Sequence, residues 1–413
     1  MSLTNQAKPK AKNTDLSPTP PLPTGTPKEL GLSPKGLQSM KDAISREIDK
    51  GTMPGGVIMM GRKGKVAILE AMGKQSPTSD APMRTDSVFR IYSMTKPVIS
   101  LAIMMLMEEG RILLTENLSN FIPEFKNMNV LVRENGKVSL APAKREITIA
   151  DLLMHTAGFA HHANKPGYIQ ELYANWDITR RNQTNEEHAH TLAKIPLISH
   201  PGEEWNYSRS SDILGRVIEV ASGQNLGEFL SARIFLPLQM HDTGFHIDEK
   251  RGSGRLAEPF SPDPWDGTEV TAFDMHEKPV FEAAGSGLVS TAPDYARLLQ
   301  MFINRGELDG IRLVGSKTVE LMTANHLASN IKIDSELMPP GYGFGLGFAV
   351  RTHVGLAPFP GSVGDCYWTG SFGTQFCIDP KENMWALFLM QAPGARFHIR
   401  IMIRNLVYAA LDS

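Results

Sequence analysis

The sequence predicts a mixed α/β (α+β) fold in which an antiparallel sheet is flanked by helices and a mainly helical lobe is inserted. Strand patterns occur near both ends of the chain, at residues 57–69 and 343–390, whereas short helical patterns between polar loops fill the middle. Strands at both ends with helices between them indicate one sheet built from N- and C-terminal pieces. We therefore expect an α/β domain from residues 33–110 and 281–413, and a helical lobe from residues 111–280.

Length and charge limit the classes of protein that the chain can represent. Its 413 residues are enough for two domains, or for one large domain with an insertion. The 42 basic and 44 acidic side chains nearly balance, and no long basic run could follow a phosphate backbone. The longest apolar run, near residues 97–107, is well short of the about 20 residues that span a bilayer. We expect neither nucleic acid nor a membrane as a partner.

The N-terminal segment has the composition of an arm. Residues 1–32 are rich in proline, lysine, serine and threonine, and they lack the apolar core of about 7–15 residues that a signal peptide needs. We predict that residues 1–32 form a flexible arm.

The two cysteines, Cys366 and Cys377, provide no disulfide framework. This favours a reducing compartment, and therefore the cytoplasm. The two side chains could face each other across a hairpin centred near residues 371–372, but we expect free thiols.

Two elements are expected early in the chain. Ser33 and Pro34 supply an N-cap and a proline at the first helical position, and apolar side chains follow at helical spacing. Two apolar runs on either side of a glycine-containing segment indicate a β-hairpin. The expected order is a helix at 34–50, strands at 57–60 and 66–69, a polar loop at 75–86, and a strand at 87–91.

Further elements are indicated after residue 111. Thr148 and Asp151 form a capping-box pattern before an apolar run, and Gly158 is placed to end that helix. Apolar spacing then predicts helices and, towards the C-terminus, strands. These are a helix at 212–222, a small-residue turn at 285–289, a helix at 293–302, strands at 343–350, 365–369, 373–378 and 384–390, and a final helix from about 395.

A serine and a lysine stand together at the start of the apolar helix near residue 97. Ser93 and Lys96 are three residues apart, so in one helical turn their Cβ atoms lie roughly 5–6 Å apart. A serine hydroxyl becomes nucleophilic when a base takes its proton, and a lysine can be that base if burial or nearby cations lower its pKa from about 10.4. The helix N-terminus would also favour an oxyanion beside Ser93. The pattern favours nucleophilic catalysis.

A second Ser-x-x-Lys pattern is formed by Ser329 and Lys332. It lies in a polar stretch with no apolar helix behind it, so we expect no chemistry there.

Tyr207 and Arg209 precede another predicted buried helix. A tyrosine could relay a proton if cations such as Lys96 and Arg209 lower its pKa from about 10. Taken alone, a tyrosine in this position is more often a packing residue.

Residues 367–374 combine aromatic side chains with a glycine-containing turn. A strand here could lie beside a substrate, with the N–H of Ser371 directed at the same oxygen as the N–H of Ser93. Taken alone, this segment is an ordinary glycine-rich hairpin.

The histidines do not indicate a metal site. We interpret His155 as structural, because it falls in the last turn of the helix that begins at the capping box, where a cation is favoured. His161, His162, His188 and His190 cluster loosely, but without acidic or cysteine partners at a compact ligand spacing. We expect no metal and no cofactor.

In their order and separation, these segments resemble the serine β-lactamase and penicillin-binding-protein superfamily. The branch that they resemble most is the family VIII carboxylesterases, which are relatives of class C β-lactamases. The resemblance covers roughly residues 35–410 and includes residues 152–158 and 201–205. It implies a β-lactamase/transpeptidase-like fold.

The resemblance also implies a role for individual residues. Ser93 would be the nucleophile, Lys96 the general base and Tyr207 the proton-transfer partner. The backbone N–H groups of Ser93 and Ser371 would form the oxyanion hole. Substrate contacts are expected from Tyr92, Arg209, Trp368, Thr369 and Gly370.

Two departures from the penicillin-recognising enzymes are informative. Their third motif is Lys-Thr-Gly, but Trp368 replaces the lysine here, as in the esterase branch, so an apolar wall replaces a cationic anchor. Arg209 stands in place of the asparagine of their second motif, which disfavours efficient lactam recognition. The Gly-x-Ser-x-Gly motif of α/β-hydrolases is absent around Ser93.

These features predict a hydrolase of carboxylic esters with short to medium acyl chains, which acts through an acyl-enzyme on Ser93. A β-lactamase or D-amino-acid peptidase, an acyltransferase to a small alcohol, and a non-catalytic assembly protein remain alternatives. The expected partner is a small-molecule ester. The oligomeric state, including a homodimer, stays open.

Overall fold

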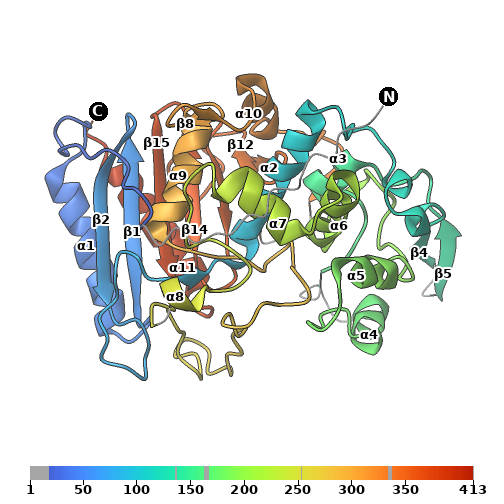
Figure 1. The fold of residues 1–413 in the computed structure, drawn as a ribbon, viewed down its shortest axis with the longest axis horizontal. Helices are drawn as coiled ribbons and strands as arrows, with labels where there is room; N and C mark the ends of the chain where they lie inside the picture. The colour runs from blue at the N-terminus through green and yellow to red at the C-terminus, as the bar shows by residue number, and fades with distance from the viewer. Residues whose placement is uncertain (1–17, 135–136, 162–166, 253, 334–336, 413) are drawn as a thin grey trace, which may run out of the picture.

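A seven-stranded antiparallel sheet forms the centre of the computed structural model, which describes residues 18–134, 137–161, 167–252, 254–333 and 337–412 (Figure 1). Its strand order is β11-β12-β13-β14-β15-β1-β2. The strands are β1 (Gly55–Arg62), β2 (Lys65–Gly73), β11 (Tyr342–Phe344), β12 (Ala349–Arg351), β13 (Cys366–Thr369), β14 (Gln375–Asp379) and β15 (Met384–Met390). Because β1 pairs with β15, the two ends of the sequence meet in one sheet, which confirms the predicted fold class.

Helices cover both faces of this sheet. Since alternate side chains of a strand point to opposite faces, Met60 and Phe388 pack towards α1 (Pro34–Asp49) and α11 (Arg396–Ala409), whereas Met59 and Leu387 belong to the core around α2 (Thr95–Glu108) and α9 (Ala292–Ile303). The other helices are α3 (Ile149–Met154), α4 (Tyr168–Asn175), α5 (Asn185–Leu192), α6 (Ser210–Ser222), α7 (Leu226–Leu230), α8 (Glu249–Gly252) and α10 (Ser316–Met322). In Figure 1, α4 to α6 lie on the side of the molecule away from α1.

The predicted helix starts are confirmed, but one predicted helix end is wrong. The Ser33 hydroxyl accepts a hydrogen bond from the Gly36 N–H, and Thr148 and Asp151 complete their capping box. Helix α3 ends at Met154 and not at Gly158, because His155 adopts the left-handed conformation (φ 59°) that terminates a helix.

Two strand predictions need correction. The single strand expected at 343–350 is a pair, β11 and β12, because the chain reverses at Gly347 (φ 97°). Within the predicted helical lobe, β4 (Asn129–Glu134) and β5 (Lys137–Pro142) form a hairpin. Three short strand pairs complete the sheets of the described residues: β3 (Phe89–Arg90) with β7 (Val289–Ser290), β6 (Glu204–Trp205) with β10 (Lys332–Ile333), and β8 (Glu307–Leu308) with β9 (Ile311–Arg312).

The N-terminal segment is not a flexible arm from residue 18 onwards. Leu22, Leu30 and Leu32 are buried, and the backbone of residues 23–25 exchanges hydrogen bonds with Val66 of β2 at 2.7 and 3.0 Å. Backbone pairing of this kind needs no apolar periodicity, so the proline-rich composition concealed it. The remaining part of the predicted arm, residues 1–17, lies outside the described residues.

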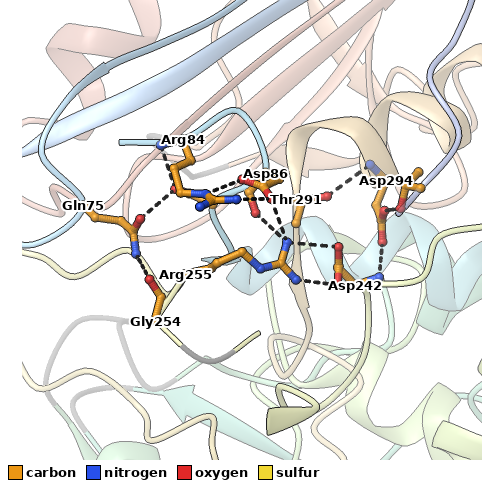
Figure 2. Close-up of polar contacts among 10 residues, drawn as sticks. Gln75, Arg84, Asp86, Asp242, Gly254, Arg255, Thr291 and Asp294 are labelled. Carbon is orange, nitrogen blue, oxygen red and sulfur yellow. Dashed lines mark hydrogen bonds and ion pairs between the residues drawn. The ribbon is translucent and has the colours of Figure 1, made fainter. Parts of the chain in front are cut away.

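A polar network ties the start of α9 to distant loops. Arg255 pairs with Asp242 and also contacts Asp86, as Figure 2 shows. The buried Asp294 carboxylate accepts hydrogen bonds from the Asp242 N–H (2.8 Å) and the Thr243 hydroxyl (2.7 Å), and from the Thr19 hydroxyl of the N-terminal segment. Burial raises the pKa of Asp294 to about 6.

Cys366 and Cys377 are free and buried, which confirms the expected thiols. They do not face each other, however. The register of β13 and β14 pairs Cys366 with Ile378 and Tyr367 with Cys377, so the two thiols point to opposite faces of the sheet.

Candidate active site

Ser93 lies between a short strand and a buried helix. It belongs to a 3₁₀ turn, η1 (Tyr92–Met94), that joins β3 to α2. Tyr92 has a positive φ of 44°, a conformation that a bulky side chain rarely adopts and that is concentrated at functional sites. Every residue of α2 from Thr95 to Leu106 is buried, while Ser93 itself is partly exposed. The serine is therefore presented to solvent from a rigid support.

Three predicted catalytic side chains meet at the Ser93 hydroxyl. The Lys96 Nζ lies 3.2 Å from Ser93 Oγ, and the Tyr207 hydroxyl lies 2.6 Å from the same atom. The Lys96 Nζ also lies 4.6 Å from the centre of the Tyr207 ring. A hydroxyl held between an amine and a phenol has two groups within proton-transfer distance.

Lys96 is oriented by the turn that follows residue 284. Its Nζ donates a 2.7 Å hydrogen bond to the Gly285 carbonyl, and the Gly285 N–H donates a 2.7 Å bond to Asp212 on α6. A Cβ at residue 285 would lie 3.0 Å from the Asp212 carboxylate, so glycine suits this close approach. The small-residue turn recognised in the sequence thus has a positioning role.

Arg209 differs from its expected role as a substrate contact. It is buried, and its guanidinium pairs with Asp212 at 3.3 Å. Burial opposes ionisation of Asp212, but the charges of Arg209, His188 and Lys96 together hold the pKa of Asp212 below its usual value. The Arg209–Asp212 pair therefore supports the turn that holds Lys96.

Trp368 also differs from the expectation of an open apolar wall. Its ring centre lies 5.4 Å from that of Tyr207 and 5.3 Å from that of Phe344, and only 3% of the residue is exposed. The tryptophan therefore packs behind Tyr207, where it fixes the position of the phenol and offers a substrate little area.

His155 is a neighbour of the site that the sequence did not reveal. Its ring centre lies 4.9 Å from that of Tyr207, and its Nδ1 lies 3.2 Å from the Ser208 hydroxyl. Burial and the Lys96 charge lower the pKa of His155 well below its ordinary value, so the expectation of a cation at this helix end is wrong. A neutral imidazole here packs against the tyrosine.

The turn between β13 and β14 rests on the backbone immediately before Ser93. A Cβ at Gly370 would lie 2.4 Å from the Ile91 carbonyl, so this approach requires glycine. The Phe372 ring lies 4.4 Å from the Tyr92 ring. Between these contacts Ser371 is exposed, and Thr369, at the end of β13, is partly exposed. Ser371 is thus held beside the segment that carries Ser93.

Tyr92 is more enclosed than a substrate-contact residue was expected to be. It is buried between Phe372 and Phe273, and burial raises the pKa of its phenol, which keeps it neutral.

The second Ser-x-x-Lys pattern lies in a different setting. Ser329 is exposed in a turn, and Lys332 begins β10, which pairs with β6. Among the described residues that follow it, β11 is the next element and not a buried helix, and its lack of a catalytic role stays a prediction.

In the described part of the chain, no group of three or more His, Cys, Asp or Glu side chains is arranged to hold a metal ion. No helix there combines the length and the apolar character needed to cross a membrane.

The sheet and the two helical layers define the β-lactamase/transpeptidase-like class of fold. The Beta-lactamase family model matches residues 40–409, so this chain belongs to that family. The predicted superfamily is therefore confirmed, and it includes esterase relatives.

Three relatives cover nearly the whole chain. Protein Rv1367c of Mycobacterium tuberculosis is 32% identical over 366 residues, which are 86% of this chain and 90% of the relative. Esterase EstB of Burkholderia gladioli is 28% identical over 406 residues, which are 93% and 98% of the two chains. The solved structure of EstCE1, described as a hydrolase with promiscuous acyltransferase activity, has a TM-score of 0.76 and 26% identity over 91% of this chain and 99% of its own.

Proposed function

We propose that this protein is a serine hydrolase that cleaves carboxylic esters with short to medium acyl chains through an acyl-enzyme on Ser93. The observation that carries the proposal is the contact of one serine hydroxyl with both Lys96 Nζ and the Tyr207 hydroxyl. The esterase relatives EstB and EstCE1 support the choice of ester as substrate class.

In the acylation step, Ser93 Oγ attacks the ester carbonyl carbon while its proton passes to the Lys96–Tyr207 pair. The carbonyl oxygen becomes an oxyanion, which the backbone N–H groups of Ser93 and Ser371 would stabilise. When the intermediate collapses, the bond to the alkoxy group breaks, and the departing alkoxide takes the proton from Tyr207 and leaves as the alcohol.

In the deacylation step, a water molecule takes the place of the alcohol. The same pair accepts a proton from the water as it attacks the acyl carbon, and it returns that proton to Ser93 Oγ as the carboxylic acid leaves. Lys96 keeps a fixed position in both steps because Gly285 holds its Nζ.

Transfer to an alcohol in place of water is the second candidate function. The same acyl-enzyme would serve it, and the promiscuous acyltransferase activity named for EstCE1 favours testing it. A β-lactamase or D-amino-acid peptidase is less favoured, because Trp368 supplies no cation for a substrate carboxylate.

A cytoplasmic location is part of the proposal. It rests on the two free, buried thiols, the state expected in a reducing compartment.

A substrate panel tests the proposal. Initial rates are measured with p-nitrophenyl esters from acetate to decanoate, with and without 1-butanol, and with nitrocefin and a D-alanyl-D-alanine peptide. We expect the highest kcat/KM with a short or medium ester, and a fall of at least about 10³-fold in kcat/KM in Ser93→Ala.

Ester hydrolysis undiminished in Ser93→Ala would refute the assignment. A higher kcat/KM with nitrocefin or the peptide would select the alternative reaction, and no turnover of any substrate would favour the non-catalytic alternative.

A further inference from the structure

The peptide that joins Gly370 to Ser371 is held from behind by an arginine. Arg400 lies on α11, and its Nη2 donates a hydrogen bond to the Gly370 carbonyl. Helix α11 packs on one face of the sheet, whereas α2, which follows Ser93, packs on the other. Arg400 therefore approaches the Gly370 carbonyl from the α11 side of the sheet, and the same carbonyl also accepts the Gly373 N–H of its own turn at 3.0 Å.

The geometry of the peptide bond fixes the direction of the next N–H group. The Gly370–Ser371 peptide is trans, so its C=O and N–H point in opposite directions. A carbonyl directed at Arg400 consequently directs the Ser371 N–H to the face that carries Ser93. On that side, Gly370 lies so close to the Ile91 carbonyl oxygen that a Cβ would clash with it. The Phe372 ring contacts the ring of Tyr92, the residue before Ser93.

The surroundings of the Arg400 guanidinium are not those of an arginine that only stabilises the fold. In the part of the chain that the structure describes, no carboxylate pairs with this guanidinium, and its Nε has no hydrogen-bond partner. Burial, with Arg396 nearby, lowers the pKa of Arg400 to about 9. Arg404, one turn further along α11, has the usual arrangement instead, since it pairs with Asp365. A partly buried guanidinium without a carboxylate partner loses solvation, which indicates that the charge serves the turn it contacts.

We propose that Arg400 is a positioning residue for the oxyanion hole: it locks the plane of the Gly370–Ser371 peptide so that the Ser371 N–H faces the carbonyl oxygen of the substrate. A cation on the carbonyl oxygen also polarises the amide, which makes its N–H a stronger donor. The inference rests on the proposed function, in which that N–H stabilises the oxyanion.

Matched substitutions on α11 test this role. Arg400→Met removes the charge and keeps an unbranched side chain, Arg400→Lys keeps the charge, and Arg396→Met makes the same change one turn earlier, where the guanidinium bonds to the Pro393 carbonyl. For each variant, kcat and KM are measured with p-nitrophenyl butyrate. The inhibition constant of phenylboronic acid, which forms a negatively charged tetrahedral adduct with a nucleophilic serine, is measured as well.

We expect Arg400→Met to lower kcat by about 10- to 100-fold with KM within about threefold, since removal of one oxyanion donor costs about 10²–10³ in kcat. Phenylboronic acid should bind more weakly by a similar factor. Arg400→Lys should recover part of both losses, and Arg396→Met should stay close to the wild type.

Several results would overturn the inference. One is a kcat for Arg400→Met as high as that for Arg396→Met; another is a loss in kcat without any loss in boronate affinity. A rise in KM confined to esters with a free carboxylate would make Arg400 a substrate anchor instead.

If Arg400→Met does not fold, Arg400→Lys and Arg400→Gln decide the question by the same measurements. Hydrolysis that survives Ser93→Ala would refute the proposed function, whereas hydrolysis lost in Ser93→Ala and undiminished in Arg400→Met would refute only this inference.

Discussion

The Tyr207 hydroxyl lies 2.6 Å from Ser93 Oγ, although 114 residues separate the two in the chain. Helices α2 and α6 pack together, and the turns that precede them carry Ser93 and Tyr207 to the same point. Trp368 and His155 pack against the phenol ring and restrict its position. The tyrosine is therefore held within proton-transfer distance of Ser93, as the proposed mechanism requires.

Tyr207→Phe removes only the hydroxyl that contacts Ser93. We expect kcat for ester hydrolysis to fall by about 10²–10⁴, the usual contribution of a general acid or base, with little change in Tm. Tyr408→Phe is the matched control, because it removes a hydroxyl bonded to Asp379 at 2.8 Å, on the far face of the sheet. Equal rates for the two variants would show that the Tyr207 hydroxyl takes no part in the reaction.

The two Ser-x-x-Lys patterns should respond differently to substitution. Lys96→Ala is expected to reduce kcat almost as much as Ser93→Ala, by roughly 10³-fold or more, because groups that act as a unit lose activity together. Ser329→Ala should retain wild-type kcat, since Ser329 is exposed in a turn. The rates of p-nitrophenyl butyrate hydrolysis check both statements, and a larger loss in Ser329→Ala than in Lys96→Ala would reverse the assignment.

The sequence predicted the parts of the site that depend on local spacing. Ser93 and Lys96 share a turn, and the capping patterns at Ser33 and Thr148 are equally local. The positions of Tyr207 and Ser371 came instead from the resemblance to a family. Arg400 was missed, because its contact with Gly370 depends on how α11 packs on the sheet, for which the spacing of residues in the sequence gives no signal.

The errors in the predicted fold have comparable physical causes. The β11–β12 reversal was missed because glycines alternate with apolar residues up to Gly347 and an apolar run follows it, so the segment has the pattern of one strand. The N-terminal segment pairs through its backbone, which leaves no pattern in the side chains. The charge of His155 was misjudged because burial outweighs the attraction of a helix end for a cation.

Leu30→Ala tests whether the N-terminal segment is part of the folded body. Leu30 is buried in the core around α1 and α11, so we expect the free energy of unfolding to fall by about 2–5 kcal/mol. Leu113→Ala is the control, because 61% of Leu113 is exposed. Urea unfolding measures both variants, and equal midpoints would mean that residues 18–32 contribute nothing to stability.

Asp294 should make stability depend on pH. Its folded-state pKa of about 6 lies above the ordinary value of 3.8, so the folded state binds the proton more tightly than the unfolded chain. The resulting stability is fully present below pH 3.8 and is lost as the pH rises through 6. We expect the free energy of unfolding of the wild type, relative to Asp294→Asn, to fall by roughly 3 kcal/mol between these limits. Urea unfolding at a series of pH values measures this difference, and a difference that is constant or rises with pH would contradict the account.

The central claim is that Ser93 is the nucleophile, and covalent labelling tests it most directly. The protein is incubated with an alkyl p-nitrophenyl phosphonate, digested, and analysed by tandem mass spectrometry alongside Ser93→Ala and Ser329→Ala. We predict one phosphonyl group per chain, located on Ser93, with complete loss of esterase activity in the labelled protein and no adduct in Ser93→Ala. An adduct on any other residue that abolishes the activity, or full activity with Ser93 labelled, would contradict the account.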